Sequence, residues 1–92
     1  MFYWHATNNS DLESIMQHGL KAPVYVCNNP GSCLQIRNQQ IEENDKSGPG
    51  TLLKVWLSDK YKLVMDEDTD YDAFVCNSDI PVNRITIDMP FI

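Results

Sequence analysis

Residues 1–20, MFYWHATNNSDLESIMQHGL, contain the signals of a strand followed directly by a helix. The aromatic and apolar run at residues 1–7 predicts a short, buried first strand. His5 lies near the end of this run, in front of the small pair Ala6 and Thr7. A histidine in that position is either packed in the core or directed into a site, and the rest of the chain has to decide between the two.

The helix that follows has a start signal, an apolar face and a stop signal. Ser10 and Glu13 have the spacing of a capping box, which predicts that the helix starts at Ser10. Gly19 is placed to take the left-handed conformation after the last turn, with Leu20 folding back onto the helix. The apolar face has the spacing i, i+3 and i+4 and consists of Leu12, Ile15 and Met16.

The remainder of the chain predicts one more helix and several strands. Asn29 is expected to cap a second short helix that has Pro30 in its first position and runs to about Arg37. Residues 38–50 contain one apolar residue, and their latter half is expected to form an exposed loop. Strands are expected at 23–27, 51–58, 61–65, 72–76 and 84–89. Early helices and late strands predict a single α+β domain spanning residues 1–92.

Composition and charge exclude several classes of protein. With 92 residues, 42% of them hydrophobic and 22% charged, the chain has the composition of one compact domain. A net charge of -6 argues against nucleic-acid binding by phosphate neutralisation. No segment approaches the roughly 20 apolar residues of a membrane-spanning helix, and the first residues lack the pattern of a signal peptide.

The cysteines and acidic residues do not predict a structural disulfide or a metal site. Cys27, Cys33 and Cys76 are odd in number and lack metal-ligand spacing, so we expect buried thiols and a cytoplasmic location. The acidic run at 66–72 has carboxylates at alternate positions but lacks the glycine and closing glutamate of a calcium loop. We therefore expect no metal.

Three segments together resemble the NAD-binding half of the ADP-ribosyltransferase fold, in its histidine-tyrosine type. They are Trp4-His5-Ala6-Thr7, Gly19-Leu20 and Val24-Tyr25-Val26. The likeness covers about the first 36 residues and extends loosely to the end of the chain. It implies two short helices early in the chain and a split, largely antiparallel sheet.

The resemblance also implies roles for individual residues. In that family the histidine hydrogen-bonds a ribose hydroxyl of NAD, and the tyrosine stacks on the nicotinamide ring. His5, Ala6, Thr7 and Tyr25 would accordingly bind NAD. The acidic catalytic position aligns with Ala73, with Asp72 beside it, so His5, Tyr25 and Asp72 are the catalytic candidates.

Two functional hypotheses follow from the resemblance. The chain is a minimal NAD-dependent ADP-ribosyltransferase that modifies a protein or nucleic-acid acceptor. Alternatively, it is a catalytically degenerate, acidic member of the fold that binds or inhibits a partner, as a phage or mobile-element anti-defence protein would. An unrelated α+β domain in which the motif is coincidental is the third interpretation.

Overall fold

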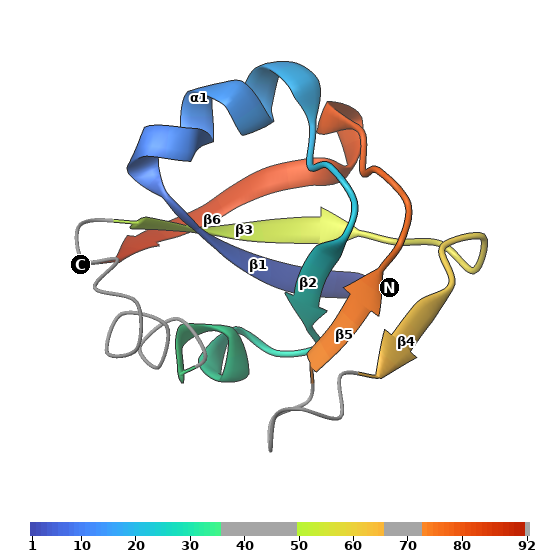
Figure 1. Cartoon of the computed structure of the whole chain (residues 1–92). Coiled ribbons are helices and arrows are strands. Elements are labelled where there is room, and N and C mark those ends of the chain that lie inside the picture. Colours follow the sequence, from blue (N-terminus) through green and yellow to red (C-terminus); the bar gives the residue numbers. More distant parts are fainter. Residues whose placement is uncertain (36–49, 66–72, 92) are drawn as a thin grey trace.

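The computed structural model describes residues 1–35, 50–65 and 73–91, which form an α+β domain around an antiparallel sheet (Figure 1). Its sheet has six strands in the order β4-β5-β2-β1-β3-β6. The named elements are β1 (Phe2–Asn8), α1 (Asn9–His18), β2 (Val24–Cys27), β3 (Gly50–Trp56), β4 (Leu63–Met65), β5 (Ala73–Cys76), η1 (Val82–Arg84) and β6 (Ile85–Phe91). Residues 30–35 form a further helical segment. The α+β class and the antiparallel sheet are confirmed.

The two helices cover opposite faces of the sheet. Figure 1 shows α1 above the central strands and the helical segment at 30–35 below them. On the α1 side, the helix packs its apolar stripe onto a cluster that includes Leu53, Val55 and Ile80. On the other side, Cys33 packs with Cys27, Leu52 and Ala73. We call these the upper and the lower cluster.

The first strand pairs along its whole length with one neighbouring strand and only briefly with the other. β1 pairs with β3 along its whole length, from Phe2 opposite Trp56 to Asn8 opposite Gly50. Its ladder with β2 has one residue pair among the described residues, Trp4 with Cys27. β1 is therefore held in the sheet mainly through its ladder with β3.

The start of α1 differs from the capping-box prediction. The helix starts at Asn9 with Asn8 as its N-cap residue, so the start at Ser10 was wrong. The reason is tertiary, because the β1–β3 ladder continues as far as Asn8 and sets the point where the chain turns. Thr51 on β3 also donates a 2.6 Å hydrogen bond to the side chain of Asn9.

The end of α1 agrees with the sequence in its main feature. Gly19 has a φ of 80°, and its backbone N–H donates to the carbonyl of Ile15 at 2.7 Å. Its ψ of -176° makes the turn more extended than the left-handed helical cap that the sequence predicts. Leu20 is buried and pairs with Ile80, which ties the end of α1 to the segment before η1.

The other boundaries shift by a few residues. The second helix has the expected cap, since the Asn29 side chain accepts from the Ser32 N–H at 2.8 Å. Arg84 belongs to η1 and not to the last strand. The far end of the second helix, most of the polar loop, the acidic run and Asp72 lie outside the described residues. Among the residues described, no helix has the length and hydropathy needed to cross a bilayer.

Candidate functional site

A cleft of about 450 Å³ lies on the α1 side of the sheet, between β1, α1 and the segment that leads into β2. Ile15, Leu20 and Val24 contribute apolar walls. The polar and charged residues that line it are His5, Thr7, Asp11, Ser14 and Lys21. The cleft is therefore lined by a mixture of apolar, polar and charged side chains.

His5 has one ring nitrogen already engaged. Its Nδ1 lies 2.7 Å from the backbone carbonyl of Tyr25, and a carbonyl oxygen can only accept, so Nδ1 carries the proton and donates. Burial lowers the pKa of His5, and the hydrogen bond to the Tyr25 carbonyl offsets part of that effect. At neutral pH the imidazole is uncharged, and Nε2 is left as a hydrogen-bond acceptor.

This pKa shift predicts a pH-dependent stability. The unfolded chain, with an ordinary histidine pKa of 6.5, binds the proton more tightly than the folded chain does. Stability from His5 is therefore complete above that value and is lost as the pH falls through it toward the lower folded-state pKa. We expect the urea midpoint to fall less between about pH 7.5 and about pH 5 in His5→Gln than in the wild type. Equal falls in both proteins would contradict the shift.

The carboxylate of Asp79, far along the chain, fixes the backbone segment at the rim of the cleft. Asp79 accepts a 2.7 Å hydrogen bond from the Ala22 N–H, and its second oxygen lies 3.8 Å from the Lys21 ammonium. Both partners of the ion pair are well exposed, so it adds little stability. The backbone contact has a clearer consequence, since it fixes the segment that carries Lys21 beside the cleft.

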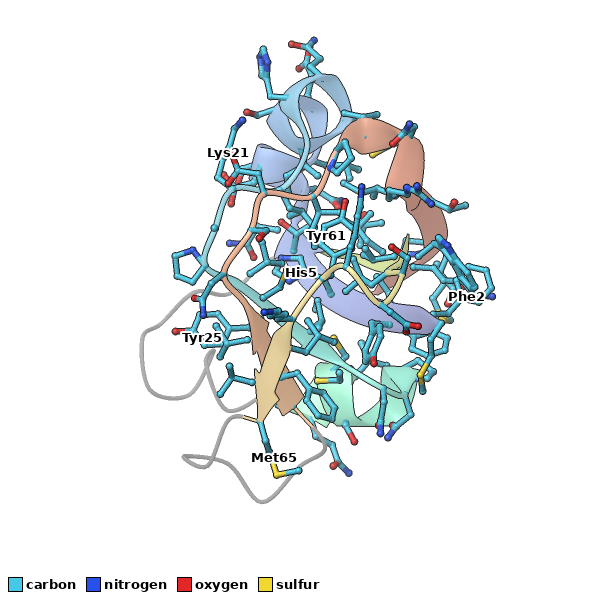
Figure 2. The ribbon with its side chains drawn as sticks, turned by 90° about the vertical axis from the view of Figure 1, so that its right-hand side faces the viewer. Phe2, His5, Lys21, Tyr25, Tyr61 and Met65 are labelled. Carbon is cyan, nitrogen blue, oxygen red and sulfur yellow. The ribbon has the colours of Figure 1, made fainter. Side chains whose placement is uncertain are left out.

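The phenol ring of Tyr25 lies on the other side of the sheet from His5. Val24 and Val26 belong to the upper cluster, so the alternation of a strand directs Tyr25 to the lower face. His5 stands between Trp4 and Ala6, which pack on the lower cluster, and it is thereby directed upward, opposite Leu53. Figure 2 shows His5 near the middle of the view and Tyr25 at its margin, and 55% of Tyr25 is exposed.

The fold thus brings only some of the site residues predicted from the sequence into the cleft. His5 and Thr7 line the cleft, and the backbone of Tyr25 holds the His5 ring. The side chains of Ala6 and Tyr25 point to the lower face. Ala73, to which the resemblance would assign the acidic position, is buried in the lower cluster opposite Cys27.

Four residues in or beside the cleft have no signal in the sequence. Asp11, Ser14 and Lys21 lie on or just after α1, where polar residues are normal for an exposed helix face. Asp79 lies 57 residues from its partner Ala22 in the sequence. No local pattern marks any of them, because each becomes part of the site through the docking of α1 and the pairing of Leu20 with Ile80.

The described residues hold no group of three or more histidine, cysteine or acidic side chains placed to bind a metal ion. No protein-family model matches the chain, and no curated protein matches its sequence. A functional assignment therefore depends on the residues of the cleft.

Proposed function

We propose that the cleft beside His5 binds the nicotinamide-ribose part of NAD, and that the chain transfers ADP-ribose from NAD to a macromolecular acceptor. The observation that carries this proposal is the meeting of His5 and Thr7 in one cleft, with the His5 ring neutral and oriented. These are two of the residues to which the resemblance assigns NAD contacts.

The His5 ring is suited to a ribose hydroxyl. A hydroxyl donates one hydrogen bond, and the uncharged imidazole has Nε2 available to accept it. The Tyr25 carbonyl holds the other nitrogen at 2.7 Å, which limits rotation of the ring before a ligand arrives. A ring fixed in this way loses less conformational entropy on binding than a free one.

The reaction needs negative charge near the sugar. The bond between nicotinamide and ribose breaks, nicotinamide leaves, and an acceptor nucleophile that loses its proton forms the new bond to the same carbon. The transition state has oxocarbenium character, which a nearby carboxylate stabilises. Asp11 lines the cleft and is a candidate for this role, beside the Asp72 that the resemblance favours.

Calorimetric titration with NAD tests the binding step. We expect His5→Ala to weaken NAD binding about tenfold, the effect of losing one buried hydrogen bond to the ligand. His18→Ala is the matched control, because His18 ends α1, is exposed and does not line the cleft. Wild-type protein that fails to bind NAD, or an affinity that is unchanged in His5→Ala, would rule the proposal out.

Turnover is tested separately with labelled NAD and cell lysate. We expect wild-type protein and His18→Ala to label an acceptor, and His5→Ala to label it much less. Tyr25→Ala then reports on the phenol ring, since a loss of binding would support the stacking role implied by the resemblance. Unchanged binding in Tyr25→Ala would mean that the cleft works without that ring.

A second candidate function is binding without catalysis. It is favoured by the lower-face position of the Tyr25 ring and by the buried alanine at Ala73. An acidic chain of net charge -6 would suit a basic protein partner. NAD-independent capture of one partner that persists in His5→Ala would support this function, whereas measurable ADP-ribose transfer would exclude it.

A further inference from the structure

Two cysteine thiols meet on the face of the sheet opposite the cleft. Cys27 is the last residue of β2, and Cys33 lies in the helical segment at 30–35. They are 3% and 5% exposed, respectively, and neither forms a disulfide. Both pack in the lower cluster, where Cys27 is close enough to act on the pKa of the Cys33 thiol. The end of β2 and the helical segment thus meet in one cluster that contains two buried thiols.

This pair lies directly behind the segment that lines the cleft. Trp4 and Ala6 pack on the lower cluster to which both cysteines belong, and the Ala6 backbone hydrogen-bonds Cys33. Ala6 stands between His5 and Thr7, whose side chains line the cleft on the other face. The thiols and the cleft are therefore separated by the thickness of one strand.

We propose that Cys27 and Cys33 form an oxidative modification site, at which a hydroperoxide converts the two thiols into an intramolecular disulfide. One thiol attacks the peroxide O–O bond and becomes a sulfenic acid, releasing water when hydrogen peroxide is the oxidant. The second thiol then attacks the sulfenic sulfur and releases a second water. Two thiols are oxidised by two electrons, and one peroxide is reduced. This inference does not depend on the proposed function.

The arrangement favours the disulfide over further oxidation. The neighbouring Cys27 side chain and burial both raise the pKa of Cys33, which keeps the Cys33 thiol protonated and slow to react. Reaction therefore proceeds when the start of the helical segment opens locally. When the segment closes again, the lower cluster returns the sulfenic acid to the neighbouring thiol, which captures it in place of a second peroxide.

Cys76 provides an internal comparison. It is fully buried in the upper cluster, on the other face of the sheet, and its thiol donates to the Ser78 carbonyl at 3.4 Å. It matches the pair in residue type and burial but belongs to the other cluster. A reaction that depends on the meeting of two thiols should therefore spare Cys76.

Digestion with trypsin places the Cys27–Cys33 pair and Cys76 on different peptides. Cleavage after Lys21 and Arg37 places Cys27 and Cys33 on one peptide, residues 22–37, while Cys76 lies on the peptide 63–84. The folded full-length protein is treated with hydrogen peroxide, alkylated after unfolding and digested without reductant. We expect peptide 22–37 to lose two hydrogen atoms and escape alkylation, and peptide 63–84 to be alkylated as in untreated protein.

Several outcomes would overturn the proposal. They are a covalent link between the two peptides, sulfinic acid on Cys27 or Cys33 in place of the disulfide, Cys76 modified as fast as the pair, and no loss of hydrogen from peptide 22–37. Variants add a second check. Cys76→Ser should form the disulfide as the wild type does, and Cys33→Ser should instead accumulate sulfinic acid or an intermolecular disulfide at Cys27. The wild-type peptide map decides the question even if Cys33→Ser does not fold.

Discussion

Replacement of Gly19 by alanine is expected to lower the free energy of unfolding by about 3 kcal/mol. Gly19 has a φ of 80° with a ψ of -176°, a combination that is essentially confined to glycine. A Cβ at this position would also collide with the backbone carbonyl oxygen of Ile80. Backbone cannot rotate away as a side chain does, so the Leu20–Ile80 pairing would have to shift. Urea unfolding followed by tryptophan fluorescence measures the loss.

Gly31→Ala is the matched control for this substitution. Gly31 lies in the helical segment at 30–35, and a Cβ there meets the Asn29 side-chain oxygen at 3.4 Å, an ordinary contact. Alanine is the better helix former by roughly 0.5–1 kcal/mol, so Gly31→Ala should be neutral or slightly stabilising. A Gly19→Ala protein as stable as Gly31→Ala would show that the turn after α1 adapts to a side chain.

Replacement of Gly19 should also change the shape of the cleft and weaken binding there. Gly19 and Leu20 form part of its wall, and Lys21 follows them on the rim. Gly19→Ala is therefore expected to weaken NAD binding in any protein that remains folded, because displacement of this segment moves the residues that line the site.

Replacement of Leu53 by alanine is the second large effect that we expect, at about 2–5 kcal/mol. Leu53 is completely buried, lies in the centre of β3 and packs in the upper cluster with Val26 and Val55. Truncation to alanine removes the contacts between the Leu53 side chain and the apolar side chains of the upper cluster. It also leaves a cavity that the surrounding sheet cannot fill. A chain of this length has a total stability of roughly 5–14 kcal/mol, so the loss would be a large share of it.

Ile87→Ala is the control for the Leu53 substitution. Ile87 is the cross-strand neighbour of Leu53 on β6, yet 49% of it is exposed. Its truncation should cost about 1 kcal/mol or less, since half of the side chain is already in contact with water. Equal losses of unfolding free energy from Leu53→Ala and Ile87→Ala, measured by urea unfolding, would contradict the placement of Leu53 in the core.

Local signals in the sequence account for most of the elements. The periodicity of Leu12, Ile15 and Met16 and the stop at Gly19 predict α1, and the β-branched and aromatic runs predict the strands to within a few residues. Asn29 and Pro30 predict the start of the second helix, which the Asn29 hydrogen bond confirms. These signals succeed because capping and amphipathic periodicity act over a few neighbouring residues.

The capping box at Ser10 failed for a complementary reason. The motif is present, but β1 continues to Asn8 because it pairs with β3, more than 40 residues further along the chain. A ladder of seven residue pairs outweighs one side-chain cap in setting where the chain turns. Propensity at a helix end is a weak determinant when a neighbouring strand has a long partner.

The sequence by itself determined the α+β class, most of the strands and helices, and the position of His5 in an apolar strand, although β1 continues beyond His5 to Asn8. Only the tertiary structure decided that His5 and Thr7 share a cleft with Asp11 and Lys21, that the Tyr25 ring lies on the lower face, and that Cys27 meets Cys33. The physical reason is the two-residue period of a strand. The alternation of side chains along a strand follows from the sequence. Which face of the sheet each side chain takes depends on the register between strands that are distant along the chain.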